Sequence, residues 1–187
     1  MKKIASIIAL ATATLATPFL AFAEGTYIKA SIGRSNYKID GGSNEHTTGG
    51  SLGLGYVIDK NWDAEIGYTN FGTIKYSDPD PSESGSLKTQ TIYAAGIGKL
   101  PITDAFSAFG KAGVAFNYSK ATIDGTPYSS SKTNTALLLG AGLNYQFTKE
   151  LAATLDYTYY GKGKIEFGGE TGDFKLDQLS AGLKYYF

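Results

Sequence analysis

Seven ionisable residues have the types and the spacing that ionic chemistry in a protein interior requires. They are four bases and three acids: Lys29, Asp63, Glu65, Lys99, Lys111, Asp156 and Lys184. Each stands between small or apolar residues, as Lys184 stands between Leu183 and Tyr185. On an extended strand this spacing directs the charges to the face opposite the apolar side chains. Charges collected in this way form ion pairs and hydrogen bonds, or they line a small ion-selective pore.

A histidine, a serine and an aspartate offer a second kind of chemistry. His46 is the single histidine, and Ser77 and Asp78 lie in a later polar stretch. A base, a nucleophile and a carboxylate of these types serve acyl-transfer enzymes. The surrounding Ser, Thr, Gly and Asp residues are common in any loop, so the sequence favours a solvated loop histidine and no enzymatic activity. The chain has no cysteine, metal-ligand spacing or nucleotide motif, so we expect no cofactor and no metal.

The charged residues can share one face only if the chain around them is extended, and the sequence predicts this. Segments with apolar residues at every second position recur, separated by turn-forming residues. They cover residues 26–37, 48–58, 62–71, 87–100, 105–118, 135–147 and 151–160, with an eighth after Gly172 that ends at Phe187. Each has roughly ten residues, the length that a tilted strand needs to cross a bilayer.

The connections between these segments alternate in length. Short turns are predicted at 59–61, 101–104 and 148–150, and long loops at 40–44, 72–85, 119–132 and 161–172. Short turns at one end and long loops at the other are typical of a membrane barrel inserted in one orientation. The sequence therefore predicts an all-β fold, an eight-stranded antiparallel up-and-down transmembrane β-barrel with both termini at the short-turn end.

Alternation alone does not say which face of the strands points inward. A soluble exported barrel of the lipocalin kind would bury the apolar face. An eight-stranded barrel is narrow, however, and here the polar face is rich in glycine and small residues. The apolar face carries aromatic residues near strand ends, as membrane barrels do at both interfaces: Tyr56, Tyr68, Phe116, Tyr145, Phe147, Tyr159, Tyr185 and Phe187. We therefore expect lipid outside and the seven charges inside.

The first 23 residues differ from the rest. Lys2 and Lys3 precede an apolar run that ends in Ala21-Phe22-Ala23, the pattern of a secretory signal peptide. We expect a signal peptide at 1–23 and an outer-membrane barrel domain at 24–187. The formal net charge of +0 offers no electrostatic footprint for nucleic acid, and the mean hydropathy of -0.14 is too low for a bundle of membrane helices.

Three stretches resemble the eight-stranded outer-membrane barrels related to the transmembrane domain of outer-membrane protein A. They are 62–68 (Trp-Asp-Ala-Glu-Ile-Gly-Tyr), 100–114 and 182–187 (Gly-Leu-Lys-Tyr-Tyr-Phe). The resemblance spans the chain after residue 23. The chain departs from that protein in that we expect no peptidoglycan-binding domain after the barrel, a plan closer to the stand-alone members of the family. The resemblance also implies that Tyr185 and Phe187 form the signal recognised by the outer-membrane assembly machinery. Glu65 and Lys111 match an interior salt-bridge network of the family, whereas Asn144 and Thr154 replace charges of that network.

Together these features predict a small integral protein of the outer membrane with a structural or surface-interaction role through four extracellular loops. We expect contacts with outer-membrane lipid and lipopolysaccharide, a possible extracellular ligand at the loops, no nucleic-acid partner and a monomeric state. A weak porin-like channel is the alternative function, and a lipid A-modifying enzyme built on His46 is a more distant one.

Overall fold

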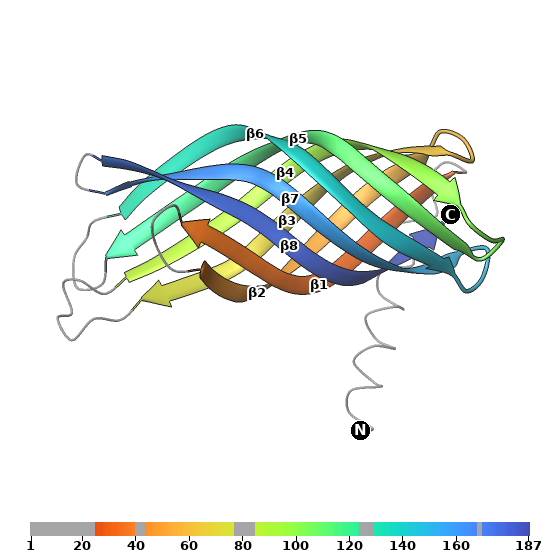
Figure 1. Ribbon diagram of the computed structural model, residues 1–187, viewed down its shortest axis with the longest axis horizontal. Helices are drawn as coiled ribbons and strands as arrows, with labels where there is room; N and C mark the ends of the chain where they lie inside the picture. Colours follow the sequence, from red (N-terminus) through yellow and green to blue (C-terminus); the bar gives the residue numbers. More distant parts are fainter. Residues whose placement is uncertain (1–24, 40–43, 77–84, 124–128, 168–169) are drawn as a thin grey trace, which may run out of the picture.

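The computed structural model describes residues 25–39, 44–76, 85–123, 129–167 and 170–187, which form a closed barrel of eight antiparallel strands. Each strand pairs with the next, and β8 pairs with β1 to close the ring (Figure 1). The strands are β1 Thr26–Ile39, β2 Asn44–Val57, β3 Trp62–Tyr76, β4 Gly85–Pro101, β5 Phe106–Ile123, β6 Ser129–Gln146, β7 Leu151–Phe167 and β8 Glu170–Tyr186. The predicted fold is confirmed. Within the described ranges, no helix has the length and apolar character to span a bilayer.

The tight turns at one end are held by side chains of their own first residues. Asp59 accepts hydrogen bonds from the backbone N–H groups of Asn61 and Trp62 at 2.6 and 2.9 Å. Thr148 does the same for Leu151 at 3.1 Å. Such Asx and Ser/Thr turns explain why these polar residues reverse the chain within a few positions. The C-terminus lies at this end of the barrel (Figure 1).

The strands extend further toward the other end than the sequence analysis predicted. Residues 119–122 pair with 129–132, and 162–167 pair with 170–175, mostly in regions predicted as loops. Two bulges explain why strands β3 and β7 were expected to end at Phe71 and Tyr160. The register shifts after each of these aromatic residues, at Gly72 (φ 83°) and Gly161 (φ 79°), and alternation resumes on the opposite parity. A period-two pattern read from the sequence therefore breaks at both positions.

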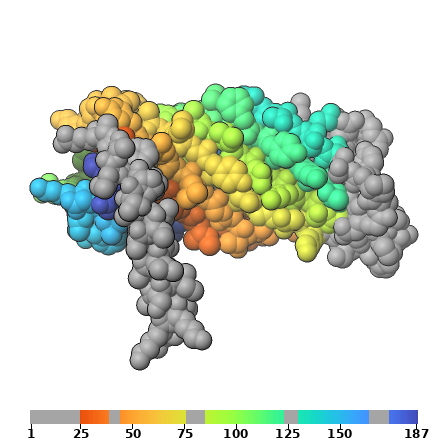
Figure 2. Space-filling model, turned by 180° about the vertical axis from the view of Figure 1, so that it is seen from behind, coloured from red at the N-terminus to blue at the C-terminus, as the bar shows by residue number. Residues whose placement is uncertain are grey.

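The outer wall of the barrel is apolar over its middle. Leucine, isoleucine and valine side chains are exposed there on all eight strands: Ile32, Leu52, Ile66, Ile92, Val114, Leu137, Leu139, Leu143, Leu155, Leu179 and Leu183. Aromatic side chains, including Trp62, Tyr118, Tyr145 and Tyr185, are exposed nearer the strand ends. Figure 2 shows this wall from the side of β2 to β6, coloured orange through teal. The apolar face therefore points outward, and an exposed apolar band with aromatic edges requires lipid around it.

Candidate functional site in the barrel interior

The interior of the barrel near the tight-turn end contains a connected set of charges. Glu65 of β3 is 2% exposed and accepts hydrogen bonds from the phenol groups of Tyr27 and Tyr93, each at 2.9 Å. It lies within the electrostatic field of Lys29, Lys111 and Lys184. The two phenols occupy the carboxylate oxygens while the three ammonium groups offset its charge, which is what a buried carboxylate needs to remain ionised.

Asp156 of β7 is the second buried carboxylate. Lys29 Nζ donates to one of its oxygens at 2.7 Å, and Lys111 Nζ lies 3.4 Å from the other. All three side chains are almost fully buried. These contacts cross the lumen, because β1, β5 and β7 are not neighbours in the ring. Asp156 therefore ties three separate strands together through the centre of the barrel.

Lys184 of β8 lies in the same layer without a carboxylate within ion-pair distance among the described residues. Its ammonium group lies over the ring of Tyr27, 4.1 Å from the centroid, and 5.8 Å from the centroid of Phe109. A cation over an aromatic face is attracted by the ring quadrupole, most strongly when both are shielded from water. Tyr27 thus contacts Lys184 through its ring and Glu65 through its hydroxyl.

Asp63 and Lys99 form a separate pair closer to the tight turns. Lys99 Nζ contacts Asp63 Oδ1 at 2.5 Å, and the Lys99 side chain keeps 18% of its exposure. All seven charged residues proposed from the sequence thus lie inside the barrel: Lys29, Glu65, Lys111, Asp156 and Lys184 in one network, and Asp63 and Lys99 in this pair. Asn144 and Thr154, which stand where the family resemblance would place charges, each leave a side-chain oxygen without a hydrogen-bond partner among the described residues.

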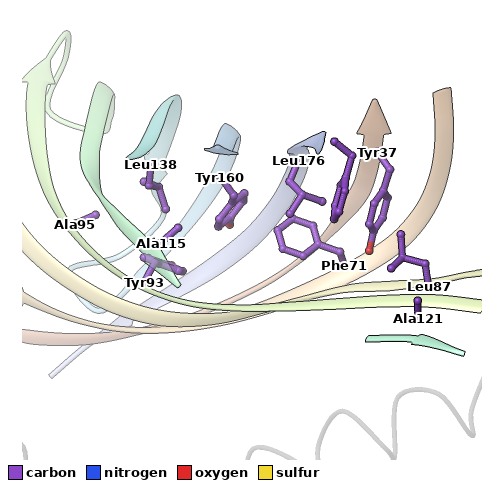
Figure 3. Packing of buried hydrophobic residues seen from close by; sticks show 11 residues of the cluster. Tyr37, Phe71, Leu87, Tyr93, Ala95, Ala115, Ala121, Leu138, Tyr160 and Leu176 are labelled. Carbon is purple, nitrogen blue, oxygen red and sulfur yellow. The ribbon is translucent and has the colours of Figure 1, made fainter. Parts of the chain in front are cut away.

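A layer of aromatic residues fills the interior toward the other end, and sequence reasoning missed it. Phe71 and Tyr160, the two residues before the bulges, meet edge to face with centroids 4.9 Å apart. Tyr37 stacks on Phe174 at 5.8 Å, and Tyr93 contacts Tyr160 at 6.0 Å. Figure 3 shows these rings pointing inward together with Leu87, Leu138 and Leu176. The expectation that the inward face is mostly small was therefore wrong.

Glycines on neighbouring strands make room for these rings. Tyr27 stands directly opposite Gly55, Tyr93 opposite Gly67, and Phe174 opposite Gly163. A Cβ atom added at any of these glycines would overlap the facing aromatic ring. Large and small residues therefore face each other across neighbouring strands, which lets the rings fit inside a narrow barrel. The cross-strand pairing of an aromatic with a glycine is the signal by which the aromatic layer could have been found.

Hydrogen-bonded side chains join the charged layer to the aromatic layer. Thr91 donates to Asn117 at 2.5 Å, and Asn117 donates to the backbone carbonyl of Tyr160 at 2.9 Å. The Tyr160 hydroxyl is hydrogen-bonded to Thr69 at 3.0 Å. Side chains thus fill the described interior from the tight-turn end to the aromatic layer, so the arrangement can stiffen the barrel and obstruct its lumen.

His46 lies on β2 rather than in the loop predicted for it. Its Nδ1 is 2.6 Å from Asn36 Oδ1, and Asn36 donates to Asp177 at 2.5 Å. No serine or threonine hydroxyl is hydrogen-bonded to His46 among the described residues. Ser77 and Asp78 lie outside the described residues.

The last two aromatic residues on the outer face pair with each other. The rings of Tyr185 and Phe187 are 5.2 Å apart and meet edge to face. The Phe187 N–H donates to the carbonyl of Thr26 at 2.9 Å, which joins the chain end to the first strand. Both residues therefore lie at the seam that closes the barrel.

An eight-stranded barrel with an apolar outer wall and a charged, filled interior defines an integral β-barrel protein of the outer membrane. The chain matches the family described as outer membrane protein beta-barrel domain over residues 5–187, and it belongs to that family. It is located in the outer membrane.

Known proteins similar to the chain support this assignment. Outer membrane protein A of Salmonella typhi and that of Shigella flexneri are each 28% identical over 199 residues, which cover 100% of this chain and 56% of the relative. The chain therefore spans about half the length of these relatives. The predicted resemblance to outer-membrane protein A is confirmed.

Solved structures share the fold. Neisserial surface protein A (NspA) superposes with a TM-score of 0.69 at 20% identity and covers 88% of this chain and 98% of its own. OprG from Pseudomonas aeruginosa superposes with a TM-score of 0.62 at 14% identity, and the match covers 88% of this chain and 96% of OprG. Ail, the attachment invasion locus protein of Yersinia pestis, superposes with a TM-score of 0.56 at 20% identity, and the match covers 87% of this chain and 100% of Ail.

Proposed function

We propose that the protein is a closed outer-membrane barrel with a structural and surface-interaction role, neither a channel nor an enzyme. The observation that carries this proposal is the filled interior. The charged network around Glu65 and Asp156 occupies one half of the lumen, and the rings of Phe71 and Tyr160 occupy the other. Because the charged network and the aromatic rings both obstruct the lumen, the outer wall and the loop end are the surfaces available for function.

The loop end of the barrel supports an interaction role. The strands there continue past the apolar band as largely polar ribbons, such as 119–122 paired with 129–132. We infer that the loops that connect these ribbons lie outside the membrane, where loops carry binding residues. A structure of Ail is a complex with the heparin analogue sucrose octasulfate. We propose, by analogy of fold, that the loops of this chain meet an extracellular ligand in the same way.

The enzyme alternative receives no support from the arrangement around His46. A general base must lie within hydrogen-bond reach of the nucleophile that it activates, whereas His46 Nδ1 contacts the Asn36 amide oxygen. We therefore propose that this chain does not modify lipid A. Mass spectrometry of lipid A from cells with and without the protein tests this point, and a mass change that disappears in His46→Ala would contradict it.

Exchange of the loops tests the surface role. Intact cells that produce the chain are compared with cells in which residues 77–84 and 124–128 are replaced by Gly-Ser segments of equal length. The control replaces the tight turn 147–150 at the opposite end. We expect binding to immobilised sulfated polysaccharide or to host-cell surfaces to fall only with the loop exchange. Equal binding by all three barrels, at equal surface amounts, would contradict the proposal.

A further inference from the structure

Three lysines form a basic patch on the outer wall near the loop end: Lys75 of β3, Lys88 of β4 and Lys120 of β5. Lys88 stands directly opposite Lys120 in the register, and Lys75 stands opposite Ser86, two residues along β4 from Lys88. All three side chains are exposed and point to the outer face. None forms an ion pair with a described residue. These strands run yellow to green across the face in Figure 2.

The patch lies just beyond the apolar band. On β5, Phe116 and Tyr118 are exposed on the outer wall, and Lys120 is the next residue on that face. Two residues along a strand tilted by about 40° rise about 5 Å along the membrane normal. Tyr118 is an aromatic residue at the edge of the band, where such residues lie level with the lipid headgroups. Lys88 and Lys120 therefore reach into the headgroup layer.

No described residue forms an ion pair that would balance these charges. Like charges directly opposite each other on neighbouring strands destabilise a sheet. The other cross-strand partners of the patch carry hydroxyl groups: Thr73 opposite Lys88, Ser131 opposite Lys120 and Ser86 opposite Lys75. In the interior, by contrast, Asp156 is paired with two lysines. An anion from outside the chain, with hydroxyl groups beside it to donate hydrogen bonds, would satisfy the arrangement.

We propose that Lys75, Lys88 and Lys120 bind the phosphate groups of the phosphorylated glycolipid in the outer leaflet, lipid A. A phosphate between Lys88 and Lys120 accepts a hydrogen bond from each ammonium group and removes their repulsion. The acyl chains of the lipid lie along the apolar wall at Ile92 and Phe116, which are paired two steps lower on the same face. The position on the wall favours a lipid over a soluble polyanion, because the side chains project sideways into the membrane. This inference is independent of a ligand at the loops.

Lipid binding by matched charge variants tests the patch. The full chain in neutral detergent is titrated with lipid A carrying two phosphates, and complexes are quantified by native mass spectrometry. The test variant is Lys88→Gln/Lys120→Gln. The control is Lys60→Gln/Lys149→Gln, which removes the same charge from exposed positions in the tight turns at the other end. Each lysine near the membrane surface contributes about fivefold to the affinity for an anionic lipid. We therefore expect the test variant to bind lipid A at least tenfold more weakly than wild type, and the control to bind it within twofold of wild type.

Two further measurements keep the result specific. Lipid A with both phosphates removed should bind wild type and test variant equally. In detergent without lipid, the melting temperature of the test variant should be no lower than that of wild type, because the repulsion between Lys88 and Lys120 is gone. Lipid A carrying two phosphates should raise the melting temperature of wild type and leave that of the test variant unchanged. Equal affinity of the two barrels for bisphosphorylated lipid A would overturn the proposal. A variant that loses sucrose octasulfate binding but keeps lipid A binding would also overturn it, because the patch would then serve a soluble polyanion.

Discussion

Replacing Asp156 with asparagine should destabilise the barrel strongly while preserving the shape of the side chain. The change removes the negative charge 2.7 Å from Lys29 Nζ and 3.4 Å from Lys111 Nζ. With an effective dielectric constant near 20, the gross attractions lost are about 6 and about 5 kcal/mol. Desolvation offsets most of this, and removal of one partner from a buried pair costs about 3–5 kcal/mol net. We expect Asp156→Asn to lower the free energy of unfolding by that amount.

A double-mutant cycle shows whether the loss comes from the ion pair. Asp156→Asn, Lys29→Met and the double variant are unfolded by urea in detergent micelles, with fluorescence of Trp62, the single tryptophan, as the signal. We expect a coupling free energy of at least about 1.5 kcal/mol, because the double variant no longer buries an uncompensated Lys29.

The control cycle pairs Asp156→Asn with Lys99→Met. Lys99 contacts Asp63 rather than Asp156, so these two changes should add within about 0.5 kcal/mol. The reasoning is refuted if Lys29 and Asp156 are also additive within that limit, or if Asp156→Asn costs less than about 1 kcal/mol. Either result would mean that the lumen is wet enough to screen the pair.

Three other predictions concern packing, assembly and export. Gly55→Ala should lower the free energy of unfolding in a urea titration by about 1–3 kcal/mol, because the new methyl group overlaps the Tyr27 ring. Gly96→Ala is the control, and it should change the free energy of unfolding little because its added Cβ meets no atom within 4 Å. Phe187→Ser should reduce the fraction of folded barrel in the outer membrane several-fold, as heat-modifiability gels would show. Phe147→Ser, which changes an exposed aromatic residue next to the end of β6, should not; equal losses would contradict an assembly role for the terminal residue. Intact-mass measurement should find a mature chain cleaved after Ala23, and a mass that includes residues 1–23 would contradict the predicted signal peptide.

The sequence was sufficient to predict the eight strands and their outward faces. Alternation through the apolar band leaves little freedom, since a shift of one residue would place Leu52 and Ile66 inside and Glu65 in lipid. The strand ends toward the loops could not be predicted. Beyond the membrane both faces of a strand can be polar, as in 129–132, and the bulges at Gly72 and Gly161 reverse the parity of the pattern.

The interior charges could be predicted as a set, but their partners could not. Lys29 and Asp156 meet across the lumen from strands that are not neighbours, and the stagger of the strands that brings them together is set by the whole ring. The inward aromatics were missed because Tyr93 and Tyr160 have the same residue type as the outward aromatic edges. Only the register, which places Tyr93 opposite Gly67, distinguishes the two groups.

Ion conductance of the wild-type barrel is the most direct test of the claim that its interior is closed. The purified full chain is reconstituted in planar lipid bilayers, with Phe71→Ala/Tyr160→Ala as a variant that removes the two rings packed edge to face in the aromatic layer. We predict no stable conductance steps for wild type. We expect none for the variant either, because the charged network around Glu65 and Asp156 still obstructs its lumen, provided that both fold by heat-modifiability. A steady, ion-selective conductance of wild type would contradict the closed interior and favour a small channel.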